Sequence, residues 1–404
     1  MRQARFLLPF LNLGHVFVHL FMLIYPTALL ALGPALGLSY DKLLNLSLGG
    51  FIAYGVGSLP AGWLGDHWNR RHMVALFFLG TGVAAVLTGA ARSPFEIAGG
   101  LTLLGLFASI YHPVGIALLV EGASKVGRRL GFNGLCGNLG IASAALITGA
   151  LAQLLGWRAA FILPGAISVL LGLAFLLLVP DLPRSQSAAA PRSAGVSRRL
   201  FARIFLLLVL ATICDSIVFN AVTIAMPKLF AERLSALTES TVAIGALVSS
   251  AYVVAAFAQL WVGRLIDRHS LRRVFLPVAA LQVPLLLLTG LAGGVFVLPA
   301  AAALMFFIFG LLPVLDAMIA RYADERWRAR AYAVAYVVSF GASPAAVPLV
   351  AALHGTAGGF TSLFYVLTIV GLGTFGAAVA FPDLDRRTVS GARPAGAVPA
   401  RNPG

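Results

Sequence analysis

The 404-residue chain is 60% hydrophobic and only 11% charged, and it contains 43 glycines besides. A soluble domain has roughly 25% charged residues, so this composition excludes a soluble enzyme, a disordered chain and a disulfide scaffold, and it indicates an integral membrane protein. The net charge of +15 is large enough to suggest nucleic-acid binding, so its distribution has to be examined. Cys136 and Cys214 form no metal or redox motif.

Twelve apolar runs follow one another along the chain, each near the roughly 20 helical residues that a bilayer crossing takes. Because hydrocarbon offers no partner for unpaired backbone groups, we expect every run to be a helix and the fold class to be all-α. The expected spans are 6–32, 43–64, 73–91, 96–120, 130–155, 158–179, 203–229, 241–262, 274–292, 296–320, 331–354 and 360–381.

The basic residues flank the two ends of these spans unequally. One set of ends carries only Lys42, Arg92, Arg158, Lys228 and Arg233, and the remaining Lys and Arg residues flank the other set. The positive-inside rule therefore places the arginine-rich ends and both termini in the cytoplasm. We expect a multi-pass protein of a bacterial-type inner membrane, acting as a monomer in the lipid bilayer, whose charge sets its topology and binds no nucleic acid.

The chain contains an internal repeat. A Gly-x-Leu-x-Asp element at Gly62–Asp66 recurs at Gly263–Asp267, an offset of 201 residues, and Pro113-Val114 recurs as Pro313-Val314. Between the copies lies a segment rich in Ser, Ala, Pro and Arg, which is typical of a linker. We therefore predict two six-helix bundles at 1–180 and 201–385, a cytoplasmic linker at 181–200 and a disordered tail at 386–404.

The repeated element resembles a motif of the major facilitator superfamily, as does Gly156-Trp157-Arg158 with Phe161. Ser109-Ile110-Tyr111-His112-Pro113 and the glycine-rich run 134–140 are similar to the fosmidomycin-resistance subgroup of exporters. His67 and Asn69 stand where the family usually has a basic residue and a glycine. The resemblance implies alternating access, with a cytoplasmic gate held by an ionic latch. The residues of that latch would be Gly62, Asp66, Arg70, Arg71, Gly263, Asp267, Arg272 and Arg273.

Few ionisable residues lie inside the expected spans, and they occupy the first helix of each three-helix unit, which the resemblance places around the central cavity. A charge at the bilayer centre costs about 3 kcal/mol or more, so such residues normally face water and mark a functional site. The candidate substrate and proton-coupling residues are His15, His19, Tyr111, His112, Asp215, Asn220 and Asp316.

The histidines allow three interpretations. His15 and His19 are four residues apart and share a helix face. They can exchange protons or contact a substrate, since histidine titrates near neutral pH. With His112 and Asp215 or Asp316 they can instead hold a transition-metal ion. They can also be neutral side chains that only bond neighbouring helices.

Two further patterns concern helix geometry. Pro113 and Pro313 are expected to interrupt two helices at equivalent places, which points to the binding site. Gly131, Gly134, Gly137 and Gly140 form a small-residue stripe for close helix packing.

We expect a secondary transporter, most simply a proton-coupled exporter of a drug or small organic anion. No phosphate-binding loop, GxSxG or HExxH motif occurs, so neither an enzyme nor a cofactor is expected. Two alternatives remain: a transition-metal ion transporter that uses His15, His19 and His112, and a membrane sensor or assembly factor that does not transport.

Overall fold

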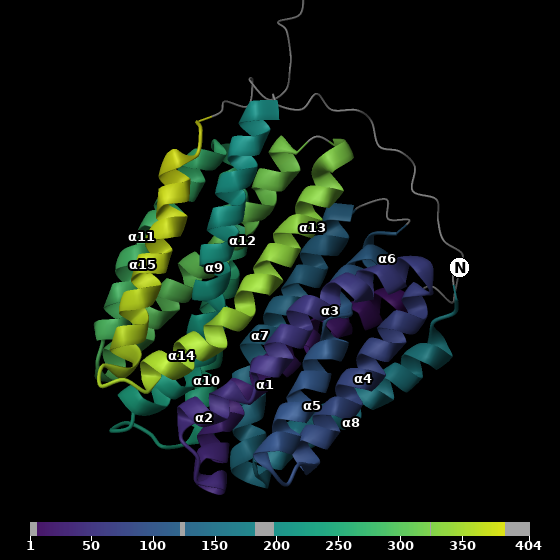
Figure 1. Ribbon diagram of the computed structural model, residues 1–404, viewed down its shortest axis with the longest axis vertical. Helices are drawn as coiled ribbons and strands as arrows, with labels where there is room; N and C mark the ends of the chain where they lie inside the picture. Colours follow the sequence, from purple (N-terminus) through teal and green to yellow (C-terminus); the bar gives the residue numbers. More distant parts are fainter. Residues whose placement is uncertain (1–5, 122–125, 182–197, 324, 384–404) are drawn as a thin grey trace, which may run out of the picture.

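The computed structural model describes residues 6–121, 126–181, 198–323 and 325–383, and within these ranges the regular elements are all helices (Figure 1). In chain order they are α1 (Leu7–Leu36), α2 (Tyr40–Asn45), α3 (Leu48–His67), α4 (Arg70–Ala90), α5 (Pro94–Ala108), η2 (Tyr111–Gly115), α6 (Ile116–Val120), α7 (Val126–Leu155), α8 (Trp157–Leu178), α9 (Arg198–Arg233), α10 (Thr241–Arg268), α11 (Leu271–Leu291), η3 (Gly294–Phe296), α12 (Val297–Tyr322), α13 (Glu325–Ala342), η4 (Ser343–Ala345), α14 (Ala346–His354) and α15 (Gly359–Ala380).

The all-α class is confirmed, because the described residues contain 12 helical spans long and apolar enough to cross a membrane. Some spans join several elements: α5, η2 and α6 together make the span Pro94–Val120. The observed helices run past the apolar stretches, as α10 does when it continues to Arg268. Hydropathy locates the membrane and not the helix end, because backbone hydrogen bonding continues into the polar interface.

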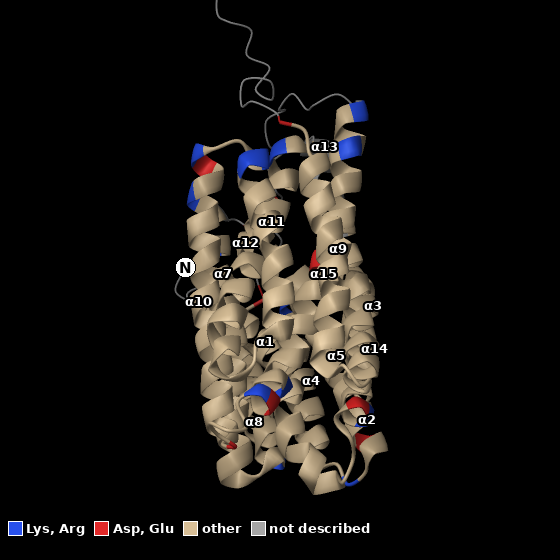
Figure 2. Ribbon diagram, turned by 90° about the vertical axis from the view of Figure 1, so that its left-hand side faces the viewer, with Lys and Arg blue, Asp and Glu red and all other residues tan. Residues whose placement is uncertain are grey.

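The helices form two bundles, α1 to α8 and α9 to α15, which Figure 1 shows as the purple-to-blue and the teal-to-yellow sets. The predicted tail at 386–404 and most of the predicted linker at 181–200 lie outside the described residues, so the domain boundaries stay predictions. Figure 2 shows Lys and Arg gathered at the upper end of the molecule, which we call the arginine-rich end.

The two bundles are joined from about half-way along the helices to the end opposite the arginine-rich one. Asn138 on α7 bonds Gln259 on α10 at 3.0 Å, and the Leu146 amide donates to the Ser249 hydroxyl at 3.1 Å. At the loop before α10, Ser240 donates to Gln153 at 2.8 Å. At the arginine-rich end, by contrast, Asn69 bonds Asp181 and Arg203 bonds the Ala380 carbonyl, each within one bundle.

The glycine stripe on α7 packs over only half of its length. A Cβ on Gly140 would meet the Val16 carbonyl oxygen and come within 2.9 Å of Val16 Cα on α1, and a Cβ on Gly137 would lie 2.7 Å from the His15 ring. A Cβ on Gly131 or Gly134 would have nothing within 4 Å. The stripe therefore brings α7 against α1 at the level of the histidines and leaves open space toward the arginine-rich end.

We predict that Gly140→Ala destabilises the protein by about 1–3 kcal/mol, because the added methyl group pushes α1 away from α7. Gly134→Ala is the matched control on the same helix, and its methyl group enters open space. The measurement is the detergent-solubilised melting temperature of both variants. Equal melting temperatures would contradict the close α1–α7 contact.

Candidate functional site

Three histidines meet where α1 passes η2. The side chains of His15, His19 and His112 offer ligand nitrogens that all lie within 4.8 Å of one another. The Nε2 atoms of His15 and His19 are 3.2 Å apart, and the His112 ring is 5.3 Å from the His15 ring and 5.5 Å from the His19 ring between centroids. All three keep partial exposure. The structure thus brings together the three histidines that the sequence singled out, and we call them the histidine cluster.

The orientation of His15 is fixed by α7. Its Nδ1 bonds the Asn133 carbonyl oxygen at 2.7 Å, and a carbonyl only accepts, so Nδ1 carries the proton. In the neutral ring Nε2 is then an acceptor, and His19 Nε2–H donates to it. A proton or a metal ion that takes this lone pair has to replace the His19 bond.

Tyr111 and Asn133 fix the position of the His15 ring. The Tyr111 ring stacks on His15 at 5.2 Å, and its hydroxyl donates to the Leu11 carbonyl at 2.5 Å. Asn133 donates to the Tyr111 hydroxyl and to the Asn12 side-chain oxygen, both at 3.0 Å. Tyr111 is a site residue expected from the sequence, and Asn133 bonds neighbouring helices, one of the two roles that its sequence position allows. The role of Asn12 emerges only when α1, η2 and α7 are seen together.

The expected proline interruptions differ between the two bundles. Around Pro113 the chain leaves α-helical geometry for a π-helix, Tyr111–Gly115, and this turn carries both Tyr111 and His112. At Pro313 the helix α12 stays continuous from Val297 to Tyr322, so the predicted interruption there is not found. A proline removes one backbone bond, which a helix can absorb without changing its type when neighbours hold it straight.

Phe340 covers the histidine cluster from the second bundle. Its ring lies 5.6 Å from His112 and 5.2 Å from Tyr54, and Tyr54 is itself buried. The Phe340 carbonyl also approaches Gly55, where an added Cβ would come within 2.5 Å of it. The sequence offered no signal for this contact, because an aromatic residue in an apolar helix is equally expected against lipid.

The two aspartates do not complete the histidine cluster. Asp215 on α9 is buried within the second bundle, where Gln282 of α11 donates to it at 3.5 Å. Asn220, one turn further, bonds the Ser216 carbonyl of its own helix. Asp316 on α12 is exposed, and the Tyr332 hydroxyl donates to its backbone oxygen at 3.2 Å. The metal set expected from the sequence is thus reduced to three histidines.

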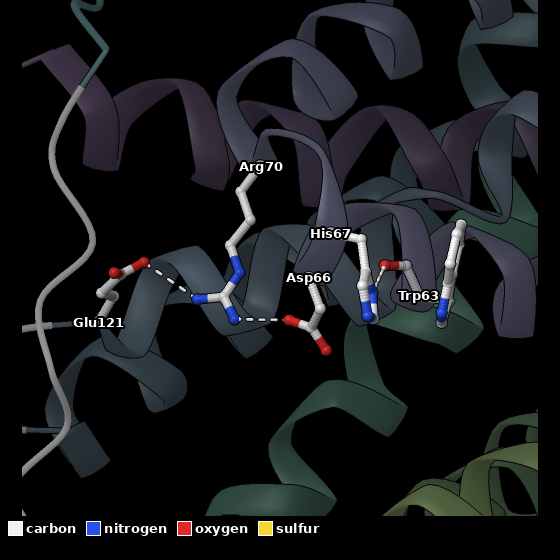
Figure 3. Close-up of polar contacts among 5 residues, drawn as sticks. All are labelled: Trp63, Asp66, His67, Arg70 and Glu121. Atoms are coloured by element: carbon white, nitrogen blue, oxygen red, sulfur yellow. Dashed lines mark hydrogen bonds and ion pairs between the residues drawn. The ribbon is translucent and has the colours of Figure 1, made fainter.

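The first copy of the repeated element forms an ionic link within one bundle (Figure 3). Arg70 reaches Asp66 at 2.8 Å and Glu121, at the end of α6, at 3.1 Å. His67 stacks on Trp63 at 4.4 Å beside this link. Sequence analysis assigned Glu121 no role, since only its position after a helix was visible. Here Arg70 ties the α3–α4 turn to α6, so in this conformation the contact does not bridge the bundles.

The remaining arginines of the repeated elements cap helix ends. Arg71 donates to the Leu176 and Val179 carbonyl oxygens at the end of α8, both at 2.5 Å. In the second bundle Arg272 donates to the Val379 carbonyl at 3.3 Å, at the equivalent end of α15. Such contacts satisfy carbonyls that a helix C-terminus leaves unpaired.

The glycines that open the two copies of the motif have different surroundings. A Cβ on Gly62 would meet Pro113 at 3.4 Å, whereas one on Gly263 would meet nothing within 4 Å. Asp267 stands near the end of α10 and Arg273 near the start of α11. Asn69, which replaces the usual glycine, accepts from the His72 amide at 3.0 Å and so caps α4.

A second cluster closes the opposite end of the molecule. Tyr40 of the first bundle is buried and lies 4.7 Å from the His354 ring, and Lys228 lies 5.9 Å above the Tyr40 ring. Glu232 bonds both Lys228, at 3.4 Å, and His354, at 2.9 Å. Nearby, Pro26 and Pro227 line one small cavity between the bundles. We call Tyr40, Lys228, Glu232 and His354 the outer cluster.

Comparisons with known proteins agree with this fold. The family model of the Major Facilitator Superfamily matches residues 11–238 and 208–402. The puromycin resistance protein pur8 of Streptomyces alboniger is 33% identical over 110 residues, which span 26% of this chain and 22% of that protein.

Solved structures show the same architecture at low sequence identity. A bacterial homolog of the human lysosomal transporter Spinster, inward-facing and unoccupied, superimposes with a TM-score of 0.79 at 16% identity, covering 94% of this chain and 98% of that one. A D-xylose-proton symporter gives a TM-score of 0.73 at 14% identity over 94% and 97% of the two chains. At these identities the likeness concerns the fold alone.

We predict that Asp66→Ala enriches the conformation open at the arginine-rich end by about fivefold, because the resemblance implies that Asp66 helps to hold this end closed, and an exposed ionic contact of that kind contributes about 1 kcal/mol. Spin labels at Trp68→Cys and His269→Cys, after both native cysteines are changed to serine, report the distance between the bundles. Asp181→Ala is the control at the same end. An unchanged distance distribution would contradict the latch.

We predict that Tyr40→Ala raises the population open at the opposite end by at least about tenfold, because a buried aromatic contact between the bundles is lost. Labels at Leu155→Cys and Thr356→Cys measure that distance. Tyr365→Ala, whose side chain is exposed on α15, is the control. A distance that stays short in Tyr40→Ala would show that the outer cluster does not close this end.

Proposed function

Because the chain belongs to the Major Facilitator Superfamily, we propose that it is a proton-coupled exporter of small organic compounds that works by alternating access between its two bundles. The protein would lie in a bacterial-type inner membrane as a monomer, with both termini in the cytoplasm. The charge asymmetry at the helix ends supports this orientation. Partial identity to a puromycin resistance protein supports export of a drug-like compound, and the motifs at 109–113 and 134–140 resemble the fosmidomycin-resistance exporters.

The observation that carries the proposal is the histidine cluster at the meeting of the two bundles. The His15 Nε2 acceptor can take a proton in exchange for its bond to His19, and His19 and His112 are only half-buried. Phe340 of the second bundle lies directly against His112. A charge that appears on the cluster therefore changes a contact between the bundles. In this way protonation can shift the equilibrium between the two conformations of the transporter.

The conformation also supports a direction of loading. Among the described residues, bonds between bundles occur at mid-height and near the loop before α10, whereas Asn69 and Arg203 at the arginine-rich end bond within their own bundles. With the arginine-rich end in the cytoplasm, this conformation is open inward. A compound would enter from the cytoplasm, reach the histidine cluster, and leave on the other side after a proton has entered from there.

The test uses inverted membrane vesicles with an imposed proton gradient and radiolabelled puromycin as the probe. We expect gradient-driven uptake by the native protein and a loss of about tenfold or more in His19→Gln, since proton exchange at the cluster contributes on that scale. His67→Gln removes an exposed histidine outside the cluster and serves as control. Gradient-driven uptake that is equal in His19→Gln and His67→Gln would contradict the proposal.

A transition-metal ion is the second candidate cargo, favoured by one specific observation. Zn–N bonds of about 2.0–2.1 Å in tetrahedral geometry separate two nitrogens by about 3.3 Å, close to the 3.2 Å between His15 and His19. Calorimetry of the purified protein with Zn²⁺ decides between the cargoes. Micromolar binding that His112→Gln abolishes would replace the organic compound by the metal, and the absence of such binding retains the first candidate.

A further inference from the structure

Three aromatic side chains stand at intervals of four residues on α13, namely Tyr332, Tyr336 and Phe340. An interval of four is close to one helical turn, so they share a face and extend over about 12 Å. Phe340 contacts Tyr54 and His112 of the first bundle, which turns this face toward the space between the bundles. We call these three side chains the aromatic ladder.

The middle member of the aromatic ladder is accessible. The Tyr336 ring stacks on Phe340, with 5.9 Å between centroids and 23° between planes, yet the residue is 48% exposed. Its other ring face and edge are therefore free to contact a ligand. The contact between Phe340 and the first bundle closes the ladder at one end, so a compound can lie along it only from the arginine-rich side.

A carboxylate stands at the open end of the ladder. The Tyr332 hydroxyl donates to the backbone oxygen of Asp316 at 3.2 Å, which places α12 beside the ladder at this level. Asp316 is exposed although it lies within the membrane span Gly294–Tyr322. A carboxylate facing lipid would cost about 3 kcal/mol or more, so its exposure indicates that it faces the watery space between the bundles.

The carboxylate of Asp316 favours a ligand of positive charge. Within the described part of the chain the ion pairs involve Asp66, Glu121 and Glu232, and none involves Asp316. A ligand cation can therefore pair with Asp316. Aromatic rings add to the same preference, because a cation over a ring face gains about 0.5–2 kcal/mol.

We propose that the compound carried by this protein is an aromatic organic cation, whose ring stacks on Tyr336 and Phe340 and whose positive charge pairs with the Asp316 carboxylate. This inference rests on the proposed function and narrows it, because that function leaves the charge of the small organic compound open. The histidine cluster lies at the far end of the ladder and would sense the ligand through Phe340.

The test compares two probes of the same shape and opposite charge, tetraphenylphosphonium and tetraphenylborate, by equilibrium dialysis against purified protein in detergent. We expect the native protein to bind the cation at least about tenfold more tightly than the anion, a factor worth about 1.4 kcal/mol. Asp316→Asn should remove this preference, and Asp316→Glu should restore it. Tyr336→Ala should weaken the binding of the cation about tenfold, whereas Tyr336→Phe and the lipid-facing control Tyr365→Ala should not.

Tighter binding of tetraphenylborate, or a preference for the cation that survives in Asp316→Asn, would overturn the inference. Melting temperatures of all variants guard against misfolding, and Asp316→Glu keeps the test valid where Asp316→Asn fails to fold. The two proposals fail separately. Gradient-driven vesicle uptake with a preference for the anion would refute only the inference, whereas cation binding that depends on Asp316 without gradient-driven uptake would refute only the proposed function.

Discussion

The cost of an unpaired polar group in hydrocarbon is the constraint on which this structure depends. It forces every crossing to be a helix, because a helix pairs its own backbone groups. It also confines charged and polar side chains to helix ends and to the faces where helices or bundles meet. The result is a molecule with a few polar sites: the histidine cluster, the outer cluster, the link between Arg70 and its two carboxylates, and the exposed side chain of Asp316.

These polar sites lie at three levels along the helices. In the proposed function they belong to one of the two conformations of an alternating-access transporter. The outer cluster joins Tyr40 to Lys228, Glu232 and His354 across the bundles. The histidine cluster lies where the bundles still touch through Phe340. Beyond it, Arg70 bonds Asp66 inside the first bundle. A transporter of this kind changes state when the contacts of one end form as those of the other break. In the described part of the chain, the contacts between bundles are those of the middle level and of the outer end.

The sequence predicts the fold well because hydropathy, charge asymmetry and the repeat each depend on local information. The twelve spans needed only run lengths, and the histidines stood out because ionisable residues are rare within apolar runs. Side-chain partners depend on how helices rotate against one another, which a pattern does not encode. Asp215 is an example: its helix faces the cavity in the resemblance, but the side chain turns inward to Gln282. Phe340, Tyr336 and Glu121 were missed because an aromatic residue in an apolar helix, or an acid at a helix end, is ordinary on its own.

The central claim is that protonation of the histidine cluster and occupation of the adjacent space by a cation exclude one another. The most direct measurement is proton release when tetraphenylphosphonium is added to unbuffered purified protein, followed over pH values from about 5 to about 8, where histidine ordinarily changes charge. We predict that ligand binding displaces fewer protons from the His15→Gln, His19→Gln, His112→Gln triple variant than from the native protein, and Asp316→Asn measures the share that the carboxylate releases. Binding without any proton exchange in the native protein, at every pH in that range, would contradict the account.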